Sequence, residues 1–425
     1  MDMHVNKEIE RAGVEGAVLR FITCGSVDDG KSTLIGRMLH DSRQVLEDQL
    51  AAVEKASTRR GMAEVDLSLL TDGLEAEREQ GITIDVAYRY FSTARRKFII
   101  ADTPGHEQYT RNMATGASTA HAAIALCDAS KGLLEQSRRH LYIAHLLGIR
   151  HLIVAVNKMD LVGYDQKTFE RIRADFCAFA DKLEGKPALR FIPLSAFKGD
   201  MVVDRGDNLD WYKGPALLEL LETLEPEVAA TEAPFRFPVQ LVQRDAERGR
   251  TYLGRVASGR VKVGQAIKVL PGAVETTVKA IYSHLESRDF AEAGESVAIS
   301  LHDERDIVRG DLISEAERPS TLERGFDATL VWMSTDALKP GGRYLIKHTS
   351  RVTKAKIARV NHLVDIKTLD NVEAGETIGV NSIVKATLNV QQPLAIDAYA
   401  KNRTTGAFIL IDEASNQTVA AGMIG

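Results

Sequence analysis

The sequence has few cysteines, no long apolar run and little net charge, and each shortage excludes a class of protein. Only three cysteines occur, Cys24, Cys127 and Cys177, and none belongs to a C-x-x-C pair, which argues against disulfides and a thiolate zinc site. We expect all three to be small buried side chains in a protein of the reducing cytoplasm. No apolar run reaches the roughly 18 residues of a membrane-spanning helix, and residues 1–17 lack the apolar core of a signal peptide.

Charge and length limit the partners and the number of domains. Lys and Arg total 54 against 59 Asp and Glu, so the net charge of −5 gives no general attraction to nucleic acid or to an anionic membrane. At 425 residues the chain is too long for a single hydrophobic core. We therefore expect about three domains.

The apolar pattern changes along the chain and marks these domains. After an N-terminal extension of residues 1–17, residues 18–224 alternate short apolar runs such as "AAIALCD" with amphipathic ones, which predicts an α/β domain with a mainly parallel sheet. Residues 225–234, "EPEVAATEAP", are acidic and bracketed by prolines, as in a linker. In 235–320 and 321–425 apolar residues alternate in twos between glycine-containing turns, which predicts two antiparallel β-barrels.

A phosphate-binding loop follows the first apolar run. Residues 25–32, "GSVDDGKS", fit the pattern G-x-x-x-x-G-K-[ST], whose glycines let backbone N–H groups point at phosphate oxygens. Lys31 is expected to reach the β- and γ-phosphates and Ser32 to ligate Mg²⁺. The helix that follows adds the positive end of its dipole. The loop therefore predicts a nucleoside triphosphate site that takes magnesium.

A second motif, "IIADTPGHEQY", supplies groups for the metal ion and for water. Asp102 ends an apolar run and is expected to hold the water shell of magnesium. The N–H of Gly105 is expected to bond the γ-phosphate, and His106 is placed to orient the hydrolytic water. Thr83, in the polar segment "EREQGITID", is expected to give magnesium a second hydroxyl, as part of a lid that the γ-phosphate holds.

The segment "VAVNKMDL" identifies the base. Asp160 is expected to accept hydrogen bonds from N1–H and the exocyclic amine of guanine, a donor pair that adenine lacks. Lys158 is expected to lie along the base, Asn157 to tie neighbouring loops together, and the N–H groups of Ser195 and Ala196 to bond guanine O6. These residues predict GTP as the nucleotide. The predicted GTP-binding residues are Gly25, Ser26, Val27, Asp28, Asp29, Gly30, Lys31, Ser32, Thr33, Asp102, Thr103, Pro104, Gly105, His106, Asn157, Lys158, Met159, Asp160, Ser195 and Ala196, and the catalytic candidates are Lys31, His106 and Thr83.

At these motifs the chain resembles the translation-factor GTPases. "DGLEAEREQGITID", "DTPGHEQYTRNM" and "VNKMDL" are similar to the elongation factors that carry aminoacyl-tRNA. Those carriers, however, usually have His at the position of Ser26 and rarely Asp at that of Asp29. "CGSVDDGKSTLIGRML", "LTDGLEAEREQGITIDVAYRYFST" and the closing "NRTTGAFILIDEASNQTVAAGMIG" instead resemble sulfate adenylyltransferase subunit 1, the family of GTPase subunits of bacterial ATP sulfurylase.

This second resemblance implies a reaction and a partner. In that family a separate, smaller catalytic subunit joins ATP and sulfate to give adenosine 5′-phosphosulfate and pyrophosphate, and GTP hydrolysis on the larger subunit drives this uphill step of sulfate assimilation. The resemblance thus implies a cytoplasmic hetero-oligomer. The charge balance and the absence of a long apolar run argue against a membrane or nucleic acid as a partner. Some members carry an adenylylsulfate kinase domain after the second barrel. The sequence has no second phosphate loop and is compatible with a complete chain or with part of such a longer protein.

Two other functions compete with sulfate activation. In an aminoacyl-tRNA carrier GTP only times delivery, and the stretch from Ala337 to Val364, which is basic and has no acidic residue, would suit RNA. Runs of this kind are more often a solvated face, and contact with a partner subunit fits as well. Residues 321–425 hold twelve Lys and Arg against ten Asp and Glu, a weak attraction for RNA. A P-loop kinase would need neither Asp160 nor His106.

Overall fold

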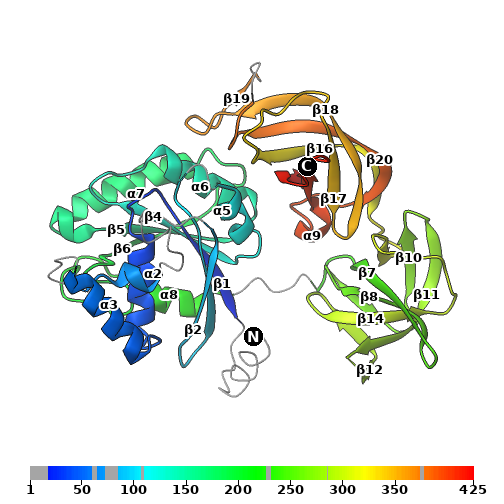
Figure 1. The fold of residues 1–425 in the computed structure, drawn as a ribbon, viewed down its shortest axis with the longest axis horizontal. Coiled ribbons are helices and arrows are strands. Elements are labelled where there is room, and N and C mark those ends of the chain that lie inside the picture. The colour runs from blue at the N-terminus through cyan, green and yellow to red at the C-terminus, as the bar shows by residue number, and fades with distance from the viewer. Residues whose placement is uncertain are drawn as a thin grey trace. The chain divides into compact units, whose positions relative to one another are not determined.

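The chain divides into two compact units (Figure 1). The computed structural model describes residues 18–59, 65–71, 85–106, 110–225, 231–284, 286–373 and 378–425. The first unit holds the chain up to Glu227 together with Ile366–Leu369, and the second unit holds the remainder. The boundary falls within the predicted linker 225–234, and both barrels belong to the second unit.

The first unit is built on a mainly parallel sheet, which confirms the predicted α/β class. The strand order is β2-β3-β1-β4-β5-β6, and every neighbouring pair is parallel except β2 with β3. Strand β4 is buried at every position because helices lie on both faces of the sheet (Figure 1). The strands are β1 (Leu19–Cys24), β2 (Ala87–Ser92), β3 (Lys97–Asp102), β4 (Ala122–Asp128), β5 (His151–Asn157) and β6 (Leu189–Pro193).

Alternate residues of β1 pack against helices on opposite faces of this sheet. Phe21 belongs to one buried cluster with Leu34 and Leu217, while Ile22 faces α5, where a Cβ at Gly116 would lie 3.6 Å from its Cγ2 atom. No helix of the described residues is long and apolar enough to cross a membrane. The helices of this unit are α2 (Lys31–Asp41), α3 (Glu47–Arg59), η1 (Leu67–Leu70), α5 (Thr110–Ala117), α6 (Glu135–Leu146), η3 (Met159–Val162), α7 (Gln166–Ala180) and α8 (Leu217–Thr223).

The second unit contains the two predicted antiparallel barrels, which confirms that part of the fold. In the first barrel β10 pairs with both β15 and β11, and this extra pairing closes the sheet. In the second barrel β17 pairs with both β21 and β18 and closes it in the same way. The bounds are β7 (Arg236–Asp245), β8 (Gly249–Arg255), β9 (Arg260–Lys262), β10 (Ala266–Leu270), β11 (Val274–Ser283), β12 (Glu286–Arg288), β13 (Phe290–Glu292), β14 (Ser296–Leu301), β15 (Leu312–Glu315), β16 (Thr321–Trp332), β17 (Arg343–His348), β18 (Arg351–Val364), β19 (Asn371–Val372), β20 (Ile383–Ile396), α9 (Arg403–Gly406), β21 (Ala407–Ile411) and β22 (Thr418–Ile424).

The cysteines follow the prediction with one exception. Cys24 and Cys127 are buried in β1 and β4, but Cys177 is exposed on α7, so its predicted burial is wrong. Helix α7 buries Ile172 and Phe176, which are four residues apart on one face. The residue after Phe176 turns about 100° around the helix axis, which carries Cys177 toward solvent.

Candidate nucleotide-binding site

The loop between β1 and α2 is shaped by two glycines that no other residue could replace without movement. Gly25 has φ of +149° and Gly30 has φ of +89°. A Cβ at Gly25 would lie 2.8 Å from the carbonyl oxygen of Leu126, and one at Gly30 would lie 2.4 Å from Nδ2 of Asn157. The loop is therefore pressed against the ends of β4 and β5, where ligands bind in sheets of this kind.

Lys31, the first residue of α2, directs its ammonium group back along the loop. Its Nζ donates to the carbonyl oxygens of Gly25 at 3.2 Å and Ser26 at 2.8 Å. Burial lowers the pKa of Lys31, against the pull of nearby carboxylates. A Cβ at Gly105 would lie 2.4 Å from this Nζ, so the chain after β3 passes directly beside the ammonium group. Thus the predicted phosphate loop and the predicted γ-phosphate contact lie side by side.

Asp29 lies inside the loop and braces it. Its Oδ2 accepts the N–H of Ser26 at 2.7 Å, and its Oδ1 is buried without a hydrogen-bond partner among the described residues. Burial raises the pKa of Asp29 to about 6, although Lys31 and the Ser26 N–H oppose the rise. The side chain of Asp29 thus helps to fix the conformation of the loop. The sequence motif does not show this role, because Asp29 occupies one of its variable positions.

Helix α6 supports the same loop with residues that the motifs did not predict. His140 Nδ1 accepts the N–H of Gly25 at 3.1 Å, so this nitrogen carries no proton. Burial, followed by the charge of Lys31, lowers the pKa of His140 to about 3. Ser137, one helical turn earlier, has its hydroxyl 3.4 Å from that of Ser26. No spacing rule points to these residues, since an amphipathic helix carries many polar side chains that never meet a loop.

The buried charge of Asp29 predicts how pH affects the nucleotide-free protein. Because the folded-state pKa of about 6 exceeds the ordinary 3.8, the folded state holds a proton longer, and stability falls as pH rises between these values. We expect the unfolding free energy of Asp29→Asn, relative to the parent, to rise by up to about 3 kcal/mol from pH 4 to pH 7. Urea unfolding at both pH values measures this. Asp48→Asn, at an exposed position of α3, is the control, and parallel curves for Asp29→Asn and the parent would contradict the prediction.

Asp102 ends β3 at the expected metal position. It is buried, and its Oδ1 accepts the hydroxyl of Thr23 at 3.1 Å. The Thr103 hydroxyl in turn donates to the Thr23 carbonyl at 2.6 Å, which fixes the strand end. Ser32, half-buried in the first turn of α2, offers a hydroxyl oxygen. Hard oxygen donors of this kind suit Mg²⁺, which takes few protein ligands and keeps several waters.

The remaining predicted residues of these motifs are placed as follows. Val27 and Thr33 are half-buried in the loop and in α2, and Asp28 has φ of +67°. Pro104 is buried, whereas the predicted water-orienting His106 is exposed to solvent. Thr83 falls outside the described residues, so its magnesium contact remains a prediction.

Asn157 connects the phosphate loop to the predicted base site. Its Nδ2 donates to the Asp29 carbonyl at 2.7 Å, and its Oδ1 accepts the N–H of Ala196 at 2.9 Å. The side chain is buried. A single amide group therefore fixes the phosphate loop and the loop after β6 against each other.

The side chains expected to read the base lie at the same edge of the sheet. Asp160 Oδ1 accepts the hydroxyl of Ser195 at 2.6 Å. Lys158 Nζ pairs with Asp128 at 2.9 Å, so Asp128, which the motifs did not predict, holds this ammonium group. Burial opposes ionisation of Asp128, but hydrogen bonds from Ser130 and Lys158 outweigh it and lower its pKa. Met159 between them is buried.

The N–H groups of Ser195 and Ala196 have hydrogen-bond partners within the protein, and their contact with guanine O6 stays a prediction. Ser195 N–H donates to the Asp200 carbonyl at 3.1 Å, and Ala196 N–H donates to Asn157 Oδ1. The hydroxyl of Ser195, rather than its N–H, faces the base site through Asp160. A contact of either N–H with O6 would have to share a donor already in use, because each N–H carries one proton.

Comparisons with known proteins agree with this fold. Residues 17–230 match the family model of the elongation factor Tu GTP binding domain, residues 249–314 that of elongation factor Tu domain 2, and residues 325–425 that of the GTP-eEF1A C-terminal domain-like family. Among solved structures, Sup35 complexed with GDP is 24% identical over 96% of this chain and 94% of that one, with a TM-score of 0.44. Sup35 complexed with GMPPNP is 23% identical over 100% and 98%, with the same TM-score. At this identity and TM-score the likeness says nothing about function.

Proposed function

We propose that this chain, which belongs to the family of the elongation factor Tu GTP binding domain, is a GTPase that drives sulfate activation. The family membership supports the GTPase, and the coupling to sulfate rests on the sequence resemblance at residues 24–39, 70–93 and 402–425. In this proposal the chain binds GTP with Mg²⁺, and hydrolysis of the γ-phosphate is coupled to a smaller partner subunit. That subunit forms adenosine 5′-phosphosulfate and pyrophosphate from ATP and sulfate, in sulfate assimilation in the cytoplasm.

Each group of the site has a proposed task. Lys31 places its charge on the β- and γ-phosphates in exchange for the loop carbonyls it now bonds. Ser32 and Asp102 would hold Mg²⁺, the latter through water, and the ion would supply positive charge beside the phosphate oxygens. His106, exposed beside the loop, orients the attacking water. Thr83 is proposed to join the metal only while the γ-phosphate is present.

The observation that carries sulfate activation is the interior of the phosphate loop. The aminoacyl-tRNA carriers usually have His at the position of Ser26 and rarely Asp at that of Asp29, as the sequence resemblance implies. Here the Asp29 carboxylate bonds the Ser26 N–H at 2.7 Å inside the loop. The loop therefore differs from the usual carrier loop at two positions, Ser26 and Asp29, and at the second of them the side chain takes part in the loop's own hydrogen bonding.

An aminoacyl-tRNA carrier or related translation GTPase is the second candidate. The family models that match the chain are named for elongation factors, and they support this candidate more directly than sulfate activation. The proposed coupling to an adenylyltransferase rests on the sequence resemblance at residues 24–39, 70–93 and 402–425. The two candidates make opposite predictions about what stimulates hydrolysis.

We expect GTP hydrolysis to be slow for the chain alone and to rise several-fold when the smaller adenylyltransferase subunit, ATP and sulfate are present together. A coupled GTPase must make a committing step depend on the other reaction, since otherwise GTP would be lost without product. Phosphate release from GTP, with each component omitted in turn, measures the dependence. The formation of adenosine phosphosulfate with and without GTP measures the reverse coupling.

A variant and a competing activator make this test decisive. His106→Ala should retain GTP binding but lose the stimulated hydrolysis, because its proposed partner is the water. A rate that ignores the subunit and sulfate but rises with ribosomes would refute sulfate activation and support the translation candidate.

A further inference from the structure

The second barrel presents a basic face to solvent on the hairpin of β17 and β18. The predicted basic stretch 337–364 supplies this face, because antiparallel pairing brings its side chains together. Arg343 stands directly opposite Lys356, and Lys347 and Lys354 follow on the same side of the sheet; all four are exposed. Among the described residues, an ion pair on this face joins Lys354 Nζ to Glu413 at 3.4 Å.

An apolar centre adjoins these charges. Leu345 pairs with Ile411, and Lys347 pairs with Ile409, on the neighbouring strand β21. Leu345, Ile409 and Ile411 are half-buried, and Val352 of β18 is 50% exposed. Because residues directly opposite in an antiparallel pair share one face, these aliphatic side chains lie among the four basic ones. We call this set the β17 face: Arg343, Leu345, Lys347, Val352, Lys354, Lys356, Ile409 and Ile411.

Part of this arrangement is unfavourable for the isolated barrel. Like charges directly opposite on an antiparallel pair are destabilising, as Arg343 and Lys356 are here. The chain as a whole carries a net charge of −5, so a local cluster of cations is contrary to its overall balance. An anionic surface that covers the face would remove the repulsion and bury the aliphatic centre.

We propose that the β17 face is the docking surface for a partner protein that presents carboxylates around an apolar patch. An aliphatic centre with a charged rim is the usual anatomy of a protein–protein contact. RNA recognition instead draws on aromatic side chains that stack with bases. The aromatic residues of these strands, Tyr344 and Phe408, are buried in the barrel core, so the face offers no aromatic ring for stacking.

The inference rests on the proposed function for the identity of the probe, which is the smaller adenylyltransferase subunit. Charge on the rim of an interface acts mainly on the association rate and its salt dependence. We expect Arg343→Glu/Lys356→Glu to lower the association rate constant at least ten-fold in surface plasmon resonance and to flatten its dependence on salt. Positions 343 and 356 carry like charges in both the parent and the variant. The variant therefore reverses the charge of the surface and keeps a similar repulsion between the two strands.

Lys262→Glu/Lys279→Glu is the matched control. Both lysines are exposed on strands of the first barrel, and the variant makes the same change in net charge. It should bind the subunit as the parent does. Circular dichroism melting of both variants shows that each is folded.

The outcomes separate this inference from the proposed function. If the parent binds the subunit and the β17-face variant binds equally well, the docking surface is refuted while the proposed function stands. If the parent fails to bind the subunit, both are refuted. If the parent binds a tRNA probe and Arg343→Glu/Lys356→Glu does not, the face binds RNA, and the inference is overturned. If the β17-face variant hydrolyses GTP at a changed rate in the absence of the subunit, the face acts on the chain's own GTPase activity, and the inference is overturned.

Discussion

Replacing Asp160 with Asn is expected to weaken GTP binding more than 100-fold, by about 3 kcal/mol. Asp160 Oδ1 already accepts the Ser195 hydroxyl at 2.6 Å, which orients the carboxylate while its other lone pairs remain for N1–H and the exocyclic amine of guanine. An amide at this position has one oxygen and one donor group. Whichever way it turns, a guanine donor meets another donor or loses its acceptor.

The same change should improve the binding of xanthosine triphosphate, whose 2-oxo group accepts a hydrogen bond from the new amide. Calorimetric titration with both nucleotides measures the exchange of specificity. Asp175→Asn, an exposed position on α7, is the control and should leave both affinities unchanged. If Asp160→Asn retains the parental GTP affinity, Asp160 does not read the base.

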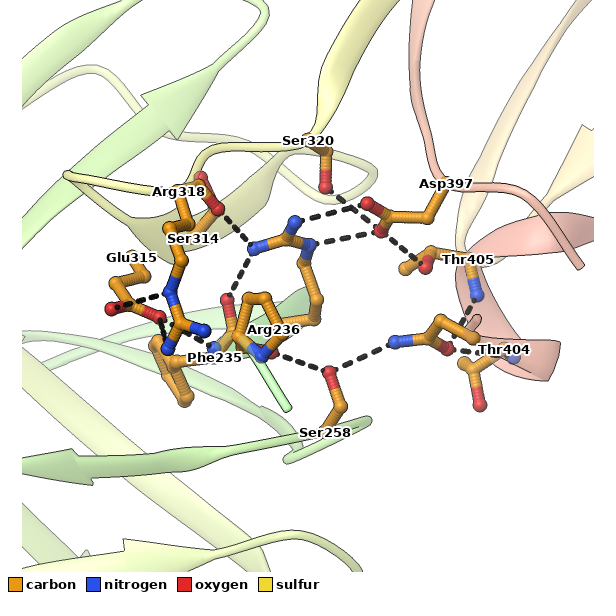
Figure 2. A network of polar contacts seen from close by, with 12 residues as sticks. Phe235, Arg236, Ser258, Ser314, Glu315, Arg318, Ser320, Asp397, Thr404 and Thr405 are labelled. Atoms are coloured by element: carbon orange, nitrogen blue, oxygen red, sulfur yellow. Dashed lines mark hydrogen bonds and ion pairs between the residues drawn. The ribbon is translucent and has the colours of Figure 1, made fainter. Parts of the chain in front are cut away.

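Arg236→Ala is expected to destabilise the second unit by about 3 to 5 kcal/mol, because it leaves a largely buried carboxylate without its cation. Arg236 begins the first barrel, and its guanidinium bonds both oxygens of Asp397 at 2.9 Å (Figure 2). The Arg236 and Asp397 side chains are 5% and 15% exposed. The pair therefore fastens the two barrels to each other inside the protein.

Further polar groups complete this joint, as Figure 2 shows. Arg236 also donates to the carbonyl oxygens of Phe235 at 3.0 Å and Arg318 at 2.8 Å. Asp397 Oδ2 also accepts the hydroxyls of Ser320 at 3.0 Å and Thr405 at 2.6 Å. Such a network loses more than one contact when its centre is removed.

The pH dependence of the Arg236→Ala effect follows from Asp397. Burial opposes its ionisation, but the hydrogen bonds from Arg236 and Thr405 outweigh burial and lower its pKa. In the parent, ionised Asp397 contributes its full stabilisation at pH values above the ordinary pKa of an aspartate. This stabilisation is lost as pH falls through the lowered pKa of the folded state. Without Arg236, burial is no longer outweighed, and Asp397 takes up a proton at higher pH. The destabilisation should therefore be smaller at pH 4 than at pH 7.

Trp332, buried in the second barrel, reports this unfolding by fluorescence in a Trp211→Phe background, since the chain has two tryptophans. Arg236→Met/Asp397→Leu is the matched variant, which removes both charges. It should be less destabilised than Arg236→Ala, because no unpaired buried charge remains, although the groups that bonded the pair lose these partners. Equal unfolding curves for Arg236→Ala and the parent would contradict the role of this joint.

The sequence by itself determined the elements whose cause is local. The runs that became β4 and β5 are almost continuously apolar because helices cover both faces of the sheet. Alternation in twos predicted the barrels because one face of each strand is buried. The phosphate loop was readable because its φ angles and close approaches require glycine at Gly25 and Gly30. Helix α3 buries only Val53 and Ser57, so few large apolar side chains mark it in the sequence, which did not predict it.

Only the tertiary structure decided which side chains meet across long stretches of chain. Gly25 and His140 are 115 positions apart, Asp29 and Asn157 are 128 apart, and Arg236 and Asp397 are 161 apart. Their contacts depend on the order of strands and on register, which no local pattern encodes. The burial of Asp29 and the exposure of Cys177 were also decided by the tertiary structure. The residue type determines the chemistry of a side chain, but the packing of the folded chain determines whether it is buried.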